Sequence, residues 1–325
     1  MKHLIFGATG LVGAQLAERL ALQGEEVYAF CRSGSEADAL RALGVRPVTG
    51  DLLDEDSIRR AVAGMDNVFN CASATDGAAA RLQAVNVLAV NAIILACRGK
   101  QVNRIVHLSC ASIHGPTTGE PVTEEAPLRP ANEYARSKAE AERVIGAYIG
   151  QPDLRLTTLR LAVPVGPLDT KVVAPLIEAF RLDRGTSWAS AGGPTVSFVD
   201  VRDVARAAIL AAADDRAIGR TYLVKSFDAT PGAFAAALGR AVGLASPAGG
   251  SALHGLGSRL LGRLTGGWRR AGRAVDDLAR SPLVSDERIR RELGFAPEHD
   301  LESTVEHIAR VYWEREIERF GRSRP

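Results

Sequence analysis

Residues 7–13, GATGLVG, follow directly on the apolar run His3–Phe6 and open a segment with helical periodicity. When glycines are spaced GxxGxxG, the first permits a tight turn from strand to helix. The second lets the backbone approach a pyrophosphate at the helix N-terminus, and the third lets helix and strand pack closely. Glycines are common in ordinary turns, but here a strand precedes the triplet and a helix follows it. The segment therefore predicts a dinucleotide-binding loop, whose contact residues we expect to be Gly7, Thr9, Gly10, Leu11, Val12 and Gly13.

Short apolar runs alternate with helix-length amphipathic segments through the first half of the chain. The runs after His3–Phe6 are Val27–Cys31, Arg46–Thr49, Asn67–Cys71, Arg104–Ser109 and Leu154–Ala162, and helical patterns begin near Gly10, Ser35, Ser57, Asn86 and Glu133. A spacing of roughly 20–35 residues between runs is typical of βαβ units, in which helices cover both faces of a parallel sheet. We therefore expect an α/β fold with a doubly wound parallel sheet of the Rossmann type.

The regular alternation fades after about residue 166, which suggests a division of the chain. Residues 1–166 are predicted to form the dinucleotide-binding domain. Residues 167–325 are predicted to be mainly a smaller C-terminal α/β substrate-binding region, with some segments returning to the sheet. Two further short strands are expected at Val196–Val201 and Thr221–Lys225.

The composition is that of a soluble globular protein. Of 325 residues, 46% are apolar and 24% charged, and the net charge is +2. A balance so close to neutral gives no strong field toward nucleic acid or an anionic membrane. No run approaches about 18 consecutive apolar residues, and the opening MKHLIFGATG leads straight into a strand pattern. We expect no nucleic-acid partner, no membrane span and no secretory signal.

The cysteines and histidines show no metal-ligand spacing. The four cysteines, Cys31, Cys71, Cys97 and Cys110, form no CxxC pair, and the six histidines form no HExxH or HxxxH motif. We therefore expect no metal site, and reduced thiols in a cytoplasmic protein.

The end of the second predicted strand bears on which dinucleotide is bound. An NAD-binding unit usually carries Asp or Glu there, to bond the ribose 2′-hydroxyl. Here that place holds Cys31, followed by Arg32 and Ser33. A carboxylate repels a 2′-phosphate, whereas the Arg32 guanidinium can bond it and stack on adenine. The pattern favours NADP over NAD, with Arg32 and Ser33 as contacts. An ordinary solvated arginine is the alternative interpretation.

A YxxxK motif, Tyr134-Ala135-Arg136-Ser137-Lys138, lies in the helical segment that follows the strand ending at Ser109. Residues four apart on a helix share a face, so the phenol and the ammonium can enter one site. A free tyrosine has a pKa of about 10, and a neighbouring cation helps it to act as acid or base near neutrality. The motif is common by chance, and its place after that strand is what favours a catalytic role.

The ordered set of motifs resembles the extended short-chain dehydrogenase/reductase family, also called the NAD-dependent epimerase/dehydratase family. The matching segments are GATGLVG at 7–13, GDL at 50–52, NCA at 70–72, HLSCASIHG at 107–115, YARSK at 134–138, LRLAVPVGP at 159–167, FVDVRDVARA at 198–207 and ERIRRELGFAP at 287–297. The resemblance covers nearly the whole chain.

The resemblance implies a Ser, Tyr and Lys set acting beside a nicotinamide. Tyr134 would be the acid/base, and Lys138 would lower its pKa and bond the nicotinamide ribose. Further cofactor contacts are expected at Asp51 and Leu52 beside adenine and at Cys71, Ala72 and Ser109 along the cofactor path.

The serine of this set is where the sequence departs from the family. Five residues before Gly115, where the family has its catalytic serine, this chain has Cys110. A thiol is a weaker hydrogen-bond donor than a hydroxyl. Ser109 or Ser112 could take its place, and Ser112 shares the parity of Cys110 if the strand continues. We therefore place Cys110 and Ser112 in the candidate catalytic set.

A second departure concerns the substrate. Nucleotide-sugar members of the family commonly carry Arg two residues before the Phe of FVxVxDVA, where it binds a phosphate, but here Val196 precedes Phe198. The segment Ser187–Thr195 offers no evident cation for a phosphate either. The chain looks more like the hydroxysteroid dehydrogenase and dihydroflavonol reductase branches, which act on ketones and secondary alcohols.

Apolar residues at helical spacing lie near the C-terminal region, at Leu253, Leu256, Leu260, Leu264 and Trp268. They indicate a core-packed helix with a basic outer face, a lid over an apolar substrate, or a helix at a membrane surface.

The sequence favours NADP-dependent reduction of a ketone, or oxidation of the matching secondary alcohol, on a small to medium apolar metabolite. One alternative is a nucleotide-sugar epimerase or dehydratase with tightly bound NAD, and another is a non-catalytic dinucleotide-binding sensor. The resemblance also implies a possible homodimer through helices near Asn86–Arg98 and Glu133–Tyr148.

Overall fold

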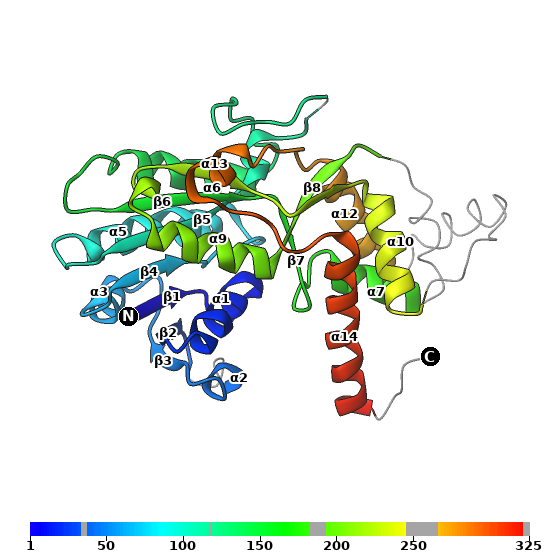
Figure 1. Cartoon of the computed structure of the whole chain (residues 1–325), viewed down its shortest axis with the longest axis horizontal. Helices are drawn as coiled ribbons and strands as arrows, with labels where there is room; N and C mark the ends of the chain where they lie inside the picture. Colours follow the sequence, from blue (N-terminus) through cyan, green and yellow to red (C-terminus); the bar gives the residue numbers. More distant parts are fainter. Residues whose placement is uncertain (34–37, 118, 182–192, 245–265, 321–325) are drawn as a thin grey trace.

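The computed structural model describes residues 1–33, 38–117, 119–181, 193–244 and 266–320 (Figure 1). Seven parallel strands form its main sheet in the order β3-β2-β1-β4-β5-β6-β9. The strands are β1 (Lys2–Phe6), β2 (Glu26–Cys31), β3 (Arg46–Thr49), β4 (Asn67–Asn70), β5 (Arg104–Cys110), β6 (Leu156–Leu161) and β9 (Thr221–Val224). The winding reverses between β1 and β4, and such sheets bind ligands in the crevice at the carboxyl ends of those strands. The predicted doubly wound α/β fold is confirmed.

Two layers of helices cover the sheet, each over its own apolar core. One layer contains α1 (Leu11–Leu22), α2 (Asp38–Arg41), α9 (Val201–Ala213) and α13 (Glu287–Leu293). The other contains α3 (Glu55–Val62), α5 (Ala89–Cys97) and α6 (Glu133–Gly146), with α4 (Ala79–Gln83) against α6. Strand β5 serves both cores, since Val106 and Leu108 join the first and Ile105 the second. This is the alternation of side chains that a strand imposes.

The helical segment expected to begin near Asn86 begins earlier, so that expectation was wrong. Helix α4 passes into a π-helical turn, η2 (Ala84–Leu88), which passes into α5. No proline or glycine interrupts residues 79–97, whereas Asn86 itself is a weak helix former. The prediction therefore took a polar residue within one continuous helix for its start.

This same helix is the one described segment long and apolar enough to cross a membrane by length and composition. The span Ala79–Cys97 has a mean hydropathy of 1.6, and 56% of its window is buried inside the protein. It packs against α3 and α6. A core helix of a soluble protein gives the same pattern, and this burial is what such a helix shows.

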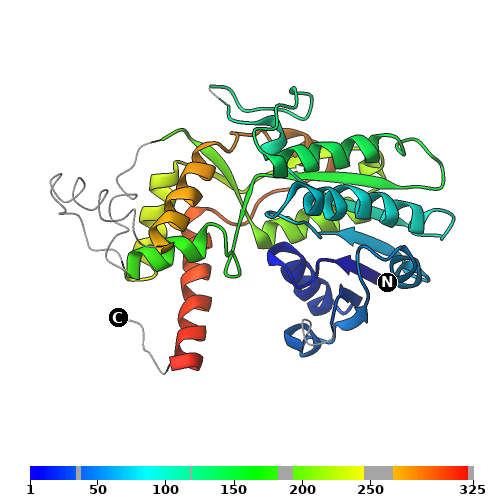
Figure 2. The same cartoon turned by 180° about the vertical axis from the view of Figure 1, so that it is seen from behind.

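A smaller region lies beyond the main sheet at one end of the molecule (Figures 1 and 2). Its three-stranded sheet has the order β10-β8-β7, with β7 (Val163–Val165) parallel and β10 (Phe227–Ala229) antiparallel to β8 (Val196–Asp200). The helices around it are α7 (Val173–Arg181), α10 (Pro231–Ala241), α12 (Gly266–Ala279) and α14 (Leu301–Phe320), and two short 3₁₀ helices elsewhere are η3 (Ala111–His114) and η4 (Asp215–Ala217). Strands β7 and β10 were not predicted, since three residues are too few to show a periodicity.

Strand β9 lies in the main sheet, although it follows the first elements of the smaller region. The division of the chain at residue 166 therefore remains a proposal. The apolar series at residues 253–264 lies outside the described residues, as does most of Ser187–Thr195.

Candidate active site

The glycine loop between β1 and α1 has the geometry of a phosphate cradle. Gly7 has a φ of +78°, and a Cβ there would lie 2.7 Å from the Ala72 backbone. A Cβ on Gly13 would lie 2.2 Å from the Gly7 carbonyl oxygen. Both glycines are therefore required by the packing of β1, α1 and the chain after β4.

Gly10 has a different place in the loop. It is the N-cap of α1, where no side chain caps the helix and no acidic residue lies in the first turn. Thr9 and Gly10 are exposed, and Leu11 and Val12 are half-buried. The N-terminus of α1 thus presents bare backbone at the crevice, which suits an anionic pyrophosphate. The residues present fit a dinucleotide.

The expected adenine side of the cofactor lies where β2 and β3 end. The Gly50 N–H donates to the Cys31 carbonyl at 3.0 Å, which joins the two strand ends. Arg32 and Ser33 are exposed just beyond Cys31. Asp51 is exposed beyond Gly50, where its carboxylate accepts the Leu53 N–H at 2.9 Å, and Leu52 beside it is half-buried. The structure thus brings these predicted contacts to the same edge of the sheet as the glycine loop.

Cys71 and Ala72 continue β4 into the same crevice. The Cys71 N–H donates to the Phe6 carbonyl at 2.9 Å. Burial raises the pKa of the Cys71 thiol to about 12, so the group is uncharged at neutral pH. Ser109 is buried on β5, and its hydroxyl has no hydrogen-bond partner among the described residues.

Helix α6 supplies Tyr134 and Lys138. The Asn132 carboxamide oxygen accepts the Ala135 N–H at 2.8 Å and so begins the helix one residue before Tyr134. Lys138 is buried, with 1% of its surface exposed, and its Nζ donates to the Leu108 carbonyl at 2.7 Å. Tyr134, one turn earlier, is half-buried. The two side chains of the motif therefore meet the carboxyl end of β5.

Electrostatics keep Tyr134 protonated in this site. Burial raises the pKa of Tyr134 well above its usual value, Cys110 raises it further, and a hydrogen bond with Ser73 opposes the rise. Burial also lowers the pKa of Lys138. The resemblance implies that Lys138 lowers the pKa of Tyr134, whereas burial raises that pKa here. At neutral pH the phenol is in the form that can give away a proton.

Cys110 and Ser112 come together at the end of β5. The strand does not continue to Ser112, because β5 ends at Cys110 and the 3₁₀ helix η3 begins at Ala111. The tight turn nevertheless places Ser112 Oγ 2.9 Å from Cys110 Sγ. Burial raises the pKa of Cys110, which also interacts with Tyr134 by a side-chain hydrogen bond. The thiol of Cys110 therefore lies beside the phenol, with the Ser112 hydroxyl next to the thiol.

Sequence reasoning missed Asn86 and Ser73. Asn86 is fully buried in the π-helical turn, where its Oδ1 accepts the Ala74 N–H at 2.8 Å and the Ser73 hydroxyl at 3.2 Å. Its Nδ2 donates to the Ala74 carbonyl and to Ser137 Oγ, both at 2.8 Å. Asn86 thus ties the chain after β4 to α6 and sets Ser73 next to Tyr134. An asparagine inside so apolar a helix was the available clue.

Sequence reasoning also missed His107 and Asn70, which lie side by side on β5 and β4. Both are buried, and Asn70 Nδ2 lies 3.2 Å from His107 Nδ1. His107 Nε2 lies 3.3 Å from Lys138 Nζ. The clue in the sequence was one polar residue in each of two apolar strands. That the two residues are neighbours depends on how the strands pair, which the sequence alone does not show.

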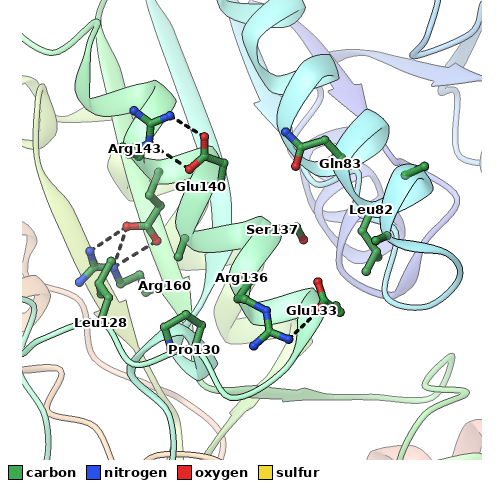
Figure 3. Close-up of a pocket in the computed structure, with 14 residues that line it drawn as sticks. Leu82, Gln83, Leu128, Pro130, Glu133, Arg136, Ser137, Glu140, Arg143 and Arg160 are labelled. Atoms are coloured by element: carbon green, nitrogen blue, oxygen red, sulfur yellow. Dashed lines mark hydrogen bonds and ion pairs between the residues drawn. The ribbon is translucent and has the colours of Figure 1, made fainter.

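A separate hollow of about 950 Å³ opens on the outer side of α6 (Figure 3). Leu82 and Gln83 form one wall and Leu128 and Pro130 another, and its charged residues pair with one another, as Arg160 does with Glu142. Tyr134, Cys110 and Ser112 do not line it. It is therefore not the candidate active site. No cluster of three or more His, Cys, Asp or Glu side chains suited to a metal ion occurs among the described residues.

Curated proteins similar to this chain include reductases. It is 31% identical over 219 residues to the 4-hydroxy-2-methyl-3-oxo-4-farnesyl-3,4-dihydroquinoline-1-oxide ketoreductase of Stigmatella aurantiaca, over 65% of this chain and 64% of that protein. It is 33% identical over 243 residues to sterol demethylase protein B of Methylococcus capsulatus, over 71% and 72% of the two chains. It is 33% identical over 193 residues to the 2-alkyl-3-oxoalkanoate reductase of Stenotrophomonas maltophilia, over 57% of each. The chain thus spans less than two thirds of the first and third of these relatives.

Solved structures match over nearly the whole chain. A short-chain dehydrogenase/reductase superfamily protein from Agrobacterium tumefaciens, with bound NAD, has a TM-score of 0.73 at 20% identity, covering 99% of this chain and 100% of that one. The dTDP-glucose 4,6-dehydratase of Streptomyces venezuelae, with NAD and TYD bound, has a TM-score of 0.77 at 22% identity, covering 97% and 98%. These likenesses establish the fold.

The family comparison covers most of the chain. Residues 3–224 match the profile described as "NAD dependent epimerase/dehydratase family". The matched range begins in β1 and ends with β9, so it contains every strand of the main sheet together with Tyr134 and Lys138.

Proposed function

Since the chain belongs to the NAD-dependent epimerase/dehydratase family, we propose that it is an NADP-dependent oxidoreductase that reduces a ketone, or oxidises the matching secondary alcohol, of a small to medium apolar metabolite. The observation that carries the proposal is the group around Tyr134. A protonated phenol lies beside the Cys110 thiol, which in turn contacts the Ser112 hydroxyl, and a buried lysine lies one turn along the same helix. A carbonyl oxygen is the substrate atom that such a set of donors suits.

The division of labour follows from these contacts. The nicotinamide, when bound, supplies or accepts the hydride at the substrate carbon. In reduction, Tyr134 gives its phenol proton to the carbonyl oxygen, and in oxidation it takes the proton back. Cys110 and Ser112 donate hydrogen bonds to the same oxygen, and Lys138 holds the ribose. The raised pKa of Tyr134 suits the reductive direction, because a phenol that stays protonated is ready as an acid.

The preference for NADP rests on Arg32 and Ser33. They are exposed at the carboxyl end of β2, where a carboxylate would repel a 2′-phosphate. Arginine bonds phosphate through a planar fork of donors. The pyrophosphate would be held by Gly7, Thr9, Gly10, Leu11, Val12 and Gly13. The adenine would lie against Asp51 and Leu52. The rest of the cofactor would contact Cys71, Ala72 and Ser109.

The apolar substrate rests on two observations. Val196 is fully buried in β8, so it offers no phosphate-binding group where nucleotide-sugar enzymes carry Arg. The substrates named for the ketoreductase and the 2-alkyl-3-oxoalkanoate reductase are ketones with apolar substituents. We infer that this chain takes a ketone of the same general kind.

A homodimer and a cytoplasmic location complete the proposal. Leu88 and Leu95 are 60% and 45% exposed and lie seven residues apart along η2 and α5, so both face outward on one side. A second copy packed there would remove them from water. Light scattering of the wild type and of Leu88→Lys would test the dimer, which the lysine should dissociate.

The four cysteines are free thiols, which suits a reducing compartment such as the cytoplasm.

The activity is tested by following NADPH absorbance with a panel of ketones. The panel holds a 2-alkyl-3-oxoalkanoate, a 3-ketosteroid and a 4-keto nucleotide sugar. Turnover of an apolar ketone that Tyr134→Phe abolishes would support the proposal. The matched control is Tyr148→Phe, just beyond the C-terminal end of α6, where the hydroxyl donates to Asn91 Oδ1. Turnover confined to the nucleotide sugar would overturn the substrate class.

A further inference from the structure

An ion pair links the segment after β4 to the smaller region. Lys171 Nζ donates to Asp76 Oδ2, across 95 positions of the sequence. Asp76 belongs to the segment between β4 and α4, and Lys171 to the segment between β7 and α7. Both side chains are more than half exposed. The pair is therefore open to solvent and to a ligand.

The Asp76 side of this ion pair lies near the candidate active site. The segment that carries Asp76 also carries Ser73, whose hydroxyl is hydrogen-bonded to Tyr134. Asn86 fixes the start of this segment, because its Oδ1 accepts the Ala74 N–H at 2.8 Å. Asp76 is only three residues beyond Ser73, and three residues of chain reach about 10 Å at most. A medium-sized metabolite can span that distance from the phenol.

The Lys171 side starts beside the glycine loop and is held by a buried carboxylate. At the start of its segment, a Cβ on Gly166 would lie 3.5 Å from the side chain of Leu11, the first residue of α1. Asp169 is buried, and its Oδ1 accepts the Lys171 N–H at 2.7 Å. The Lys171 backbone is therefore fixed close to the cofactor loop, and its side chain reaches across to Asp76.

Positive charge is in excess around this ion pair. The Arg81 side chain lies over Gly77, where a Cβ would be 3.2 Å from the arginine Cδ. Lys171 and Arg81 both act to lower the pKa of Asp76. Two cations thus act on one carboxylate. The surroundings of the pair can take one further negative charge without becoming net negative.

An exposed ion pair of this kind is readily exchanged for another. It contributes little to stability, because water screens both charges and two flexible side chains must be held in place. A ligand carboxylate would offer Lys171 the same chemical partner as Asp76. A single negative charge matches the excess of one positive charge, whereas a diphosphate carries at least two. The group that suits Lys171 is therefore a carboxylate.

We propose that Lys171 determines the substrate specificity of this site: it binds a carboxylate carried by the ketone substrate, in exchange for Asp76, so that the substrate is a keto acid with an apolar body. The inference rests on the proposed function, since it takes the ketone oxygen to be bound at Tyr134. Its test is nevertheless a binding measurement, which needs no turnover.

The test is calorimetric titration of the protein, saturated with NADP, with 2-methyl-3-oxodecanoate and with its methyl ester. NADP is the oxidised cofactor and cannot reduce a ketone, so binding is measured alone. The two ligands differ in charge and share the ketone and the apolar chain. We expect the acid to bind about tenfold more tightly than the ester, the low end of what one hydrogen bond to a charged group contributes. Equal affinities, or binding of neither ligand, would overturn the inference.

Substitutions on the two sides of the ion pair should act with opposite signs. Lys171→Gln should abolish the preference for the acid, because it removes the cation. Asp76→Asn should increase the preference about threefold, the effect of one exposed ion pair, because it removes the competitor for Lys171. An ion pair that only joined two parts of the molecule would behave differently, since both substitutions would then weaken the binding of acid and ester alike. That outcome would overturn the inference.

Lys100→Gln is the matched control. It removes the same charge from an exposed lysine between α5 and β5, at the edge of the sheet opposite the crevice. This variant should keep the wild-type preference for the acid. Loss of the preference in Lys100→Gln would trace it to the net charge of the protein and overturn the role of Lys171. The proposed function fails separately, if Tyr134→Phe retains the wild-type rate of ketone reduction while the titration still shows a preference for the acid.

Discussion

Ser112 Oγ lies 2.9 Å from Cys110 Sγ because the 3₁₀ helix η3 begins immediately after β5. The family pattern has a single serine hydroxyl at this place, whereas this chain has a thiol with a hydroxyl beside it. The pair allows Ser112 to supply the stronger hydrogen bond to a substrate oxygen, because a hydroxyl is a better donor than a thiol.

Cys110→Ser should hold or raise kcat, because a hydroxyl is a stronger donor where negative charge develops on the substrate oxygen. Cys110→Ala should lower kcat only modestly, since a thiol hydrogen bond contributes little. Ser112→Ala should cost more, about tenfold or greater, as the hydroxyl is the better donor of the pair. Steady-state kinetics of the three variants measure this order. If Cys110→Ala proved the most damaging of the three, Ser112 would not be the donor.

Bound NADP should protect Cys110 from alkylation, since the thiol lies at the carboxyl end of β5 beside the cofactor crevice. The measurement is mass spectrometry of peptides after treatment with iodoacetamide, with and without NADP. Cys97 is the internal control, because it lies buried in α5 and burial raises its pKa to about 12. Equal labelling of Cys110 in both samples would remove it from the crevice.

Tyr134→Phe should reduce kcat by about 10²-fold or more, the usual contribution of general acid–base catalysis. Cofactor affinity should change little, because the cofactor is held by the glycine loop, Arg32 and Lys138. Since burial raises the Tyr134 pKa, the phenol stays protonated through neutral pH. Loss of activity by deprotonation of Tyr134 should therefore appear in reduction only on the alkaline side, whereas oxidation should gain with rising pH. Stopped-flow rates in both directions give the two profiles, and an acid-side loss traced to Tyr134 would contradict the assignment.

Arg32→Ala should weaken NADPH binding by roughly ten- to a hundredfold, which corresponds to about 1.5–3 kcal/mol for one charge-assisted contact. NADH binding should be nearly unchanged, since NADH has no 2′-phosphate. Fluorescence titration of both cofactors measures the pair of affinities. Arg59→Ala is the control, an exposed arginine of α3 paired with Asp56. Tighter binding of NADH than of NADPH by the wild type would overturn the preference.

Asn86→Ala should destabilise the protein by about 2–4 kcal/mol, because it leaves the buried Ala74 N–H and carbonyl without partners. Asn91→Ala, on the same long helix, loses one hydrogen bond from the Tyr148 hydroxyl and should cost about 1 kcal/mol. Urea unfolding gives both values. Equal destabilisation by the two substitutions would show that the four contacts of Asn86 do not act together.

What the sequence could predict was local. The glycine spacing at 7–13 and the Tyr134–Lys138 pair each lie within one turn or helix. Their roles can therefore be predicted from residues that are close together in the sequence. The contacts of Asn86 join residues 12 and 51 positions away. The neighbours Asn70 and His107 depend on the register of two strands 37 residues apart. Such groups become visible only when tertiary contacts are known, which is why Asn86, Asn70 and His107 were missed.

Strand β9 has a consequence for how the chain can be made and divided. The chain leaves the main sheet after β6, builds the small sheet, and returns to pair Thr221–Val224 with β6, where Glu124 accepts the Leu223 N–H. During synthesis, β6 therefore remains an unpaired edge strand until about sixty more residues have been made. An unpaired edge strand can pair with strands of other chains. A fragment cut at residue 166 would keep that edge permanently. We therefore expect a fragment that ends at residue 166 to aggregate when it is expressed alone.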